Sequence, residues 1–225
     1  TDIPAKTGLG SSGSFSTALI KALYSFKGKI ISKRELAEKA CDIEINKLKQ
    51  PSGKQDQYIS AYGGITEFEI NKKGYVKVKK LNISNDTKLN LENNLLLFFT
   101  GFPRNSSLIL NEQNNKTIKQ STEIINNLDY VKKLGIEIKK SLINGNCDEF
   151  GRLMHEHWKN KLKRSKRMSN PAINNIYNFA LKNGALGGKL IGAGGGGFLL
   201  FYTDNPKRLR LAMKNKKIEE VNFKF

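Results

Sequence analysis

PAKTGLGSSGS, the stretch from Pro4 to Ser14, runs directly into an apolar pattern with helical spacing. The apolar positions of that pattern are Phe15, Ala18, Leu19, Ala22 and Leu23. A Gly/Ser loop that opens onto a helix presents unpaired backbone N–H groups and the positive end of the helix dipole, and both favour phosphate. The stretch therefore predicts a helix over residues 11–24 behind a phosphate-binding loop, and it points to nucleotide-dependent phosphoryl transfer.

Other glycine-loop motifs fit this stretch less well. Gly8, Gly10 and Gly13 match the spacing of the dinucleotide fingerprint, but the residues before them do not resemble a strand end. The P-loop pattern fails because no Gly-Lys-Ser/Thr closes the loop, and the protein-kinase pattern fails because its Lys-bearing strand and catalytic loop do not follow. A plain glycine-rich turn, capped by Ser11 or Ser12, stays open as the alternative.

Two further motifs follow in order along the chain. Residues 51–64 read PSGKQDQYISAYGG, and residues 187–198 read GGKLIGAGGGGF. Together with residues 4–14 they resemble the motifs of the GHMP kinases, the family of galactokinase, homoserine kinase and mevalonate kinase. The resemblance implies the α+β fold of that family, with an N-terminal ATP-binding domain over residues 1–85 and a ferredoxin-like C-terminal domain over residues 86–225. Because family members carry a segment upstream of the first motif, we expect this chain to be a fragment that lacks part of the N-terminal sheet.

The resemblance also implies which residues bind the nucleotide and act on the acceptor. Asp56 would face the acceptor hydroxyl, either as a base or as an electrostatic partner that orients it. The alternative for a loop aspartate is a turn-capping side chain. The residues expected to bind ATP are Lys6, Gly8, Leu9, Gly10, Ser11, Ser12, Gly13 and Ser14.

A magnesium site is implied beside that loop. Glu44 lies twelve positions before Asp56, about where family kinases carry a metal-binding acid, and Ser12 is the expected hydroxyl partner. Oxygen ligands of this kind suit Mg²⁺. Asp42 is the rival acid and Ser11 the second hydroxyl, and a solvated helix face is the alternative for both acids.

Substrate contacts are expected from separate parts of the chain. Arg104 could pair with a substrate phosphate, as an arginine fork does, and Lys189 is a weaker candidate of the same kind. A solvated loop is the alternative for Arg104, and a tight turn between two strands is the alternative for the second glycine loop. The predicted substrate-binding residues are Gln55, Arg104, Gly194, Gly195 and Gly196.

The sugar-kinase branch of the family is the nearest in pattern. Residues 54–58 (KQDQY), residues 61–64 (AYGG) and residues 184–189 (GALGGK) resemble the heptose and fucose kinases. This implies transfer of the γ-phosphoryl of ATP to the anomeric hydroxyl of D-glycero-D-manno-heptose 7-phosphate for surface polysaccharide synthesis. Fucokinase-like activity is the alternative within the family.

The amino-acid composition limits the remaining classes of function and partner. The net charge of +19 permits a basic nucleic-acid-binding domain, but the lysines are spread along the chain and no RNA-binding motif accompanies them. We expect a solvated basic surface that also attracts anionic substrates, with ATP and a sugar phosphate as partners and no nucleic acid or membrane.

Cys41 and Cys147 suit buried free thiols in the cytoplasm. His155 and His157 lack a third ligand for zinc, and oligomeric state is left open as a homo-oligomer or a monomer.

The spacing of apolar residues predicts the helices and strands. Ser32 and Asp148 are expected helix caps, and a helix break is expected near residues 128–129. Helices are expected over residues 11–24, 33–44, 58–61, 121–144, 148–165, 171–182 and 206–216, and strands over residues 65–70, 75–81, 95–100, 189–191, 198–202 and 221–225.

Overall fold

The computed structural model describes residues 7–102, 106–118 and 122–224, which form two compact units. Gly10–Asn82 make up the N-terminal unit, and the residues up to Leu9 together with Ile83–Phe225 make up the C-terminal unit. The first boundary falls inside the glycine-rich stretch. The division expected at residue 85 concerns family domains rather than compact units, and it stays a prediction.

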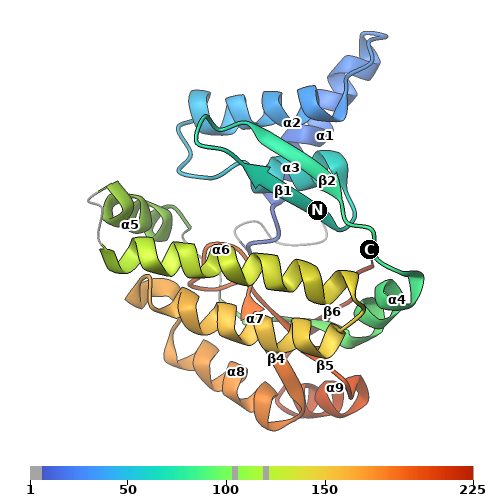
Figure 1. The fold of residues 1–225 in the computed structure, drawn as a ribbon, viewed down its shortest axis with the longest axis vertical. Coiled ribbons are helices and arrows are strands. Elements are labelled where there is room, and N and C mark those ends of the chain that lie inside the picture. The colour runs from blue at the N-terminus through green and yellow to red at the C-terminus, as the bar shows by residue number, and fades with distance from the viewer. Residues whose placement is uncertain (1–6, 103–105, 119–121, 225) are drawn as a thin grey trace. The chain divides into compact units, whose positions relative to one another are not determined.

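The N-terminal unit combines helices with one hairpin, labelled in Figure 1. The strands of the hairpin are antiparallel, with Thr66 opposite Lys80. The described elements are α1 (Ser11–Phe26), α2 (Lys33–Cys41), the π-helix η1 (Asp42–Lys47), α3 (Gln55–Tyr62), β1 (Thr66–Ile70) and β2 (Val76–Lys80).

Local signals explain most of these boundaries. The Ser32 side chain accepts a hydrogen bond from the backbone N–H of Glu35, so the predicted cap of α2 is confirmed. Gly63, with a φ of 71°, ends α3 as expected. The helix predicted over residues 33–44 is wrong at its end, because the α-helical pattern stops at Cys41 and continues as η1. Such π segments are frequent at functional sites.

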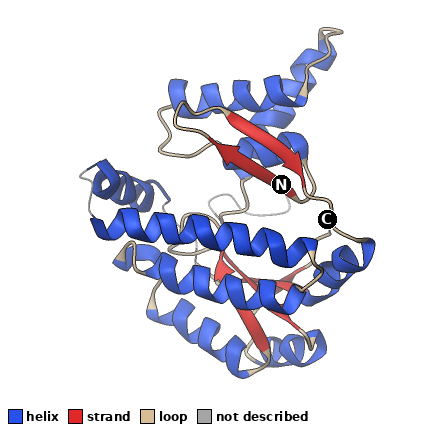
Figure 2. Cartoon of the chain, in the orientation of Figure 1, coloured by secondary structure: helices blue, strands red, loops and turns tan. Residues whose placement is uncertain are grey.

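The C-terminal unit is built on a four-stranded antiparallel sheet, shown in red in Figure 2. Its strand order is β4 (Ala185–Leu190), β5 (Phe198–Thr203), β3 (Leu95–Phe99) and β6 (Glu220–Val221). One group of helices links β3 to β4, and α9 (Pro206–Asn215) links β5 to β6. This order is the ferredoxin-like arrangement that the resemblance implied. The last strand is shorter than expected and ends at Val221.

The helices between β3 and β4 differ from the predicted ones in several respects. The break expected near residues 128–129 is wrong: α6 is continuous and buries Ile124, Leu134 and Leu142, so packing overrides a local run of weak helix formers. Asn146, not Asp148, caps α7. The sequence patterns did not indicate α4 or α5. The elements of this segment and the one before β3 are α4 (Asn85–Asn94), α5 (Ser106–Ile118), α6 (Thr122–Ile143), α7 (Cys147–Leu162), η2 (Lys166–Met168) and α8 (Pro171–Lys182).

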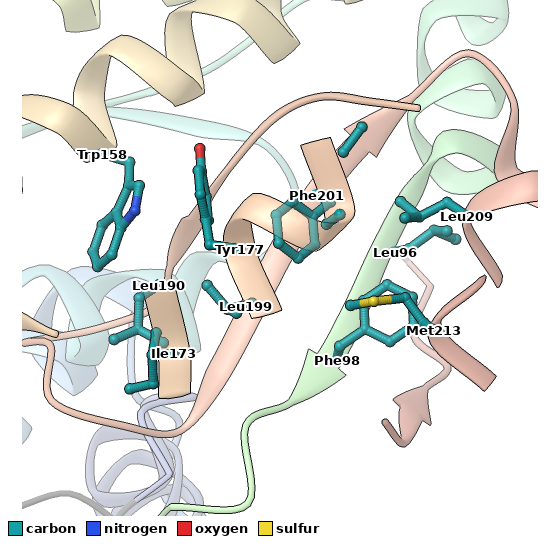
Figure 3. Close-up of a cluster of buried hydrophobic side chains, with 12 residues drawn as sticks. Leu96, Phe98, Trp158, Ile173, Tyr177, Leu190, Leu199, Phe201, Leu209 and Met213 are labelled. Atoms are coloured by element: carbon teal, nitrogen blue, oxygen red, sulfur yellow. The ribbon is translucent and has the colours of Figure 1, made fainter. Parts of the chain in front are cut away.

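A large cluster of buried apolar side chains stabilises this unit (Figure 3). Tyr177 stands between two other rings, with its centroid 5.8 Å from that of Trp158 and 5.3 Å from that of Phe201. The buried members are Leu96, Phe98, Trp158, Ile173, Tyr177, Ala180, Ala185, Leu190, Leu199, Phe201, Leu209 and Met213. Helix α7 lies directly on β4, because a Cβ on Gly187 would come within 1.9 Å of the Gly151 carbonyl oxygen. The rigid sheet therefore supports the loop that joins β4 to β5.

One prediction from composition can be compared with the structure. Cys41 and Cys147 are free and buried, as expected. Across the described ranges, no helix has both the length and the apolar character needed to cross a bilayer.

Candidate functional site

The first turn of α1 has the backbone of an anion site. Gly10 precedes the helix in the left-handed conformation, with φ 70° and ψ 24°, and no side chain caps the helix there. No acidic residue lies in the first turn of α1, so no residue of the helix itself neutralises its positive dipole end. The predicted phosphate residues Ser11, Ser12, Gly13 and Ser14 form this turn, whereas Lys6 lies outside the described residues.

Glycines of that turn bring α1 against the first turn of α3. A Cβ on Gly13 would lie 2.9 Å from the Asp56 carbonyl carbon and 3.0 Å from the Gln57 nitrogen, so any side chain there would move the backbone. A Cβ on Gly10 would lie 3.5 Å from Asp56 Cγ, which places the carboxylate beside the loop. Two helix N-termini thus meet at the predicted catalytic acid, and their dipoles favour negative charge between them.

Glu44 is a buried carboxylate with one oxygen available. Ser12 Oγ donates a hydrogen bond to Glu44 Oε2 over 2.5 Å. Glu44 is only 3 % exposed, and Glu44 Oε1 has no hydrogen-bond partner within the described ranges. Burying a charged oxygen without a partner is costly, so this geometry suits a bound cation.

Asp42, the rival acid, has a different environment. Its carboxylate accepts a hydrogen bond from Asn46 Nδ2 over 2.9 Å and pairs with Lys47 at 3.5 Å. The Asn46 hydrogen bond lowers the pKa of Asp42, and the nearby lysines lower it further. The structure therefore separates the two candidates: Glu44 points into the protein beside Ser12, and Asp42 is engaged at the surface.

The residues at this position fit Mg²⁺. No group of three or more His, Cys, Asp or Glu side chains forms a metal cluster among the residues that the structure describes. Mg²⁺ needs no such cluster in a nucleotide site, because it is commonly held by one or two carboxylates together with phosphate oxygens and waters. Glu44 and the Ser12 hydroxyl, whose oxygen keeps acceptor lone pairs while it donates, would supply the protein ligands.

Sequence reasoning missed Gln57. Gln55, the predicted substrate contact, is the exposed first residue of α3, whereas Gln57 is 1 % exposed and its Oε1 is buried with no hydrogen-bond partner in the described part of the chain. The only signal was its place next to Tyr58 in a polar run, which does not distinguish a buried amide from an exposed one.

The second glycine loop is anchored within the C-terminal unit. Gly194 packs on Met168, and Gly195 on Ile109, with Cβ positions 2.8 Å and 2.9 Å from the respective side chains. A Cβ on Gly197 would lie 1.9 Å from the carbonyl oxygen of Thr7, so this loop lies against the residue that precedes Gly8. The expected turn between two strands is confirmed. A substrate role for Gly194, Gly195 and Gly196 stays a prediction, and Arg104 lies outside the described residues.

A buried lysine fixes the entry to that loop. Lys161, 5 % exposed, donates hydrogen bonds from Nζ to the carbonyl oxygens of Leu190, over 3.1 Å, and of Gly192. These bonds tie α7 to the end of β4. No sequence pattern indicates this contact, because the backbone acceptors lie 29 and 31 residues away from Lys161.

The two histidines are packing residues in this structure. His155 Nδ1 lies 2.8 Å from the Tyr177 hydroxyl. Burial lowers the pKa of His157 to about 3, and the positive charges of Lys189, Lys161 and Arg164 act in the same direction. Burial and Arg164 also lower the pKa of Lys189. His157 is consequently neutral at physiological pH.

Comparisons with known proteins identify the family. Residues 1–64 match the family model for the GHMP kinases N terminal domain, and residues 138–219 match the model for the GHMP kinases C terminal. The D-glycero-alpha-D-manno-heptose 7-phosphate kinase of Campylobacter jejuni is 30% identical over 211 residues, which are 94% of this chain and 62% of that protein. The L-fucokinase/L-fucose-1-P guanylyltransferase of Bacteroides fragilis is 28% identical over 91% of this chain and 22% of its own length.

A solved structure gives the same result for the fold. The crystal structure of a D-glycero-D-manno-heptose 1-phosphate kinase from Bacteroides thetaiotaomicron matches with a TM-score of 0.77 and 26% sequence identity. The match covers 100% of this chain and 62% of that one. The chain thus spans less than two thirds of the length of these relatives.

Proposed function

The chain belongs to the GHMP kinase family, and from that premise we propose that it transfers the γ-phosphoryl group of ATP to the anomeric hydroxyl of a sugar phosphate. The observation that carries the proposal is the meeting of the α1 and α3 N-termini at Asp56, with Ser12 and Glu44 paired in the same unit. Phosphoryl transfer depends mainly on positioning and on charge stabilisation, which this arrangement can supply.

Each residue has a separate task in the proposed reaction. The first-turn amides of α1 hold phosphate oxygens, and Gly13 lets the two helices approach closely enough to do so. The Asp56 carboxylate accepts the proton of the attacking hydroxyl or orients it by a hydrogen bond. Ser12 and Glu44 would hold Mg²⁺, which neutralises charge on the transferred phosphate when it is bound.

The proposed acceptor is D-glycero-D-manno-heptose 7-phosphate, and the product is the 1,7-bisphosphate. The heptose kinase of Campylobacter jejuni supports this choice, and the 28% identity to a fucokinase keeps L-fucose as the second candidate. We further propose that the product serves heptose incorporation into surface polysaccharide. Two buried free thiols suit the reducing cytoplasm as its location.

ADP release by the full-length natural protein tests the proposal. The assay uses Mg-ATP with heptose 7-phosphate, with L-fucose and with no sugar. We expect release only with the heptose phosphate. Release with fucose alone would replace the substrate and keep the chemistry, whereas no release with either sugar, from a protein that still binds ATP, would contradict the proposed acceptors.

A further inference from the structure

Glu38 on α2 contacts both ends of the first turn of α3. Its Oε2 lies 2.9 Å from Lys54 Nζ and its Oε1 lies 3.2 Å from the same nitrogen. Its Oε1 also accepts a hydrogen bond from the Tyr58 hydroxyl. One carboxylate therefore links the two residues that stand two positions before and two positions after Asp56.

Lys54 and Tyr58 define the turn that carries Asp56. Lys54 is the residue before α3, and its carbonyl oxygen accepts a hydrogen bond from the Tyr58 N–H over 3.2 Å. That backbone hydrogen bond closes the turn that contains Asp56. The side chains at both ends of the turn, Lys54 and Tyr58, are also held by Glu38. The same turn packs on Gly13, so a small movement of it would change the position of the Asp56 carboxylate beside Gly10.

The Tyr58 end of the link is rigid. Tyr58 is fully buried, in a cluster with Ala37, Cys41 and Val76, and its ring lies edge-on to Phe68 with centroids 5.9 Å apart. Its hydroxyl is a polar group on an otherwise apolar ring, and leaving it unpaired in the core would be destabilising. Glu38 satisfies it and in doing so fixes the register of α2 against α3.

The protonation states favour the link at neutral pH. Burial alone would raise the pKa of Glu38, but the hydrogen bonds from Tyr58 and Lys54 and the charges of Lys54 and Arg34 together lower it. Burial raises the pKa of Tyr58, and the bond to Glu38 raises it further. Glu38 is thus an anionic acceptor and Tyr58 a neutral donor.

We propose that Glu38 is a positioning residue for the reaction: through Lys54 and Tyr58 it holds the first turn of α3 so that the Asp56 carboxylate meets the acceptor hydroxyl. The proposal rests on the proposed kinase function. In this proposal Glu38 acts through Lys54 and Tyr58, so it affects the rate of the chemical step rather than nucleotide binding.

Glu38→Gln tests this, with Glu35→Gln as the matched control. Glu35 lies one helical turn earlier on α2 and contacts Lys39 and Tyr24 at the surface, so the control makes the same change of charge without touching α3. We expect Glu38→Gln to lower kcat about 10- to 100-fold, as a small misplacement of a catalytic group does, and to leave KM for ATP unchanged. An equal kcat in the two variants would overturn the proposal.

Tyr58→Phe gives a second, milder variant that keeps the ring in the core. On its own it should lower kcat, and it should have little further effect when added to Glu38→Gln, because both changes weaken the same link between α2 and α3. Fully additive losses in the double variant would overturn the link.

Amide hydrogen exchange separates this proposal from the kinase function. The first turn of α3, residues 55–58, should exchange faster in Glu38→Gln than in Glu35→Gln, with or without activity. Faster exchange in a protein that phosphorylates none of the sugars tried would refute the substrates and keep the positioning contact. Unchanged exchange in residues 55–58 would refute the contact itself.

Discussion

The two units place their apolar side chains differently. The C-terminal unit buries a large cluster around Tyr177, whereas the clusters described around Tyr58 and around Ile20 in the N-terminal unit are smaller. Helix α1 leaves Phe15 67 % exposed and Phe26 89 % exposed. The larger cluster thus lies in one unit, and Ser12, Glu44 and Asp56, with their predicted roles in chemistry, lie in the other.

Buried polar atoms without a hydrogen-bond partner occur in both units. In the N-terminal unit, Glu44 Oε1, Ser52 Oγ and Gln57 Oε1 are buried without a partner among the described residues, and in the C-terminal unit His157 Nδ1 is too. Unsatisfied buried groups cost free energy and are common where a ligand supplies the missing partner. In the N-terminal unit these atoms include Glu44 Oε1, on the proposed Mg²⁺ ligand, whereas His157 lies on α7, the helix packed on β4. The difference between the units is therefore where such atoms lie rather than whether they occur.

The largest expected effect separates chemistry from stability. Asp56→Asn should lower kcat roughly 100- to 10,000-fold, because the variant keeps the shape of the side chain but loses a base or a strong acceptor. Binding of ATP should persist, since the α1 amides do not change. Coupled measurement of ADP release gives kcat, and calorimetric titration with a non-hydrolysable ATP analogue gives the affinity.

Asp42→Asn is the control for this comparison. It removes the same charge from the same unit, at a carboxylate engaged with Asn46 and Lys47. Its kcat should equal that of the natural protein. Full turnover in Asp56→Asn would show that Asp56 has no part in the chemistry.

Much of the fold could be predicted from local signals. Ser32 with Glu35, Pro171, and the glycines that end α3 and α8 act within a few residues of the boundaries they set, so the sequence displays them. The Asn-rich segments of α4 and α5 have weak apolar periodicity, and tertiary packing rather than pattern makes them helical.

Some residues of the candidate site could likewise be predicted from the sequence, and others could not. The resemblance supplied Ser12 and Glu44, and the structure brings them to hydrogen-bonding distance although 32 residues separate them. It could not supply Gln57, Glu38 or Lys161. Their roles come from burial and from partners distant in sequence, and a single sequence carries no periodic trace of such contacts.

A smaller effect concerns the acid stability of the C-terminal unit. His157 has its pKa lowered to about 3 from an ordinary value of 6.5, so it is neutral when folded and gains a proton on unfolding at mildly acidic pH. The stability it contributes is therefore complete above about pH 6.5 and decreases as the pH falls toward 3. Between pH 6 and pH 5 we expect a loss of about 1 kcal/mol from this residue alone.

His157→Phe should remove that part of the pH dependence. Urea unfolding followed by the fluorescence of Trp158, the one tryptophan in the sequence, reports on the C-terminal unit, in whose core it lies. His155→Gln is the control and should keep most of the slope, because His155 is less buried and its hydroxyl partner Tyr177 remains. The same slope in His157→Phe as in the natural protein would show that His157 does not titrate on unfolding.

The smallest expected effect compares one substitution in the two units. A Cβ on Gly135, in the middle of α6, would meet no atom within 4 Å, so Gly135→Ala should stabilise the C-terminal unit by up to about 1 kcal/mol through helix propensity. Gly13→Ala adds the same methyl group to α1, where it would press on the backbone of Asp56 and Gln57. It should weaken ATP binding while leaving the urea midpoint reported by Trp158 unchanged. If Gly13→Ala left both the stability and the ATP affinity unchanged, the close approach of α1 to α3 would not be what makes Gly13 necessary.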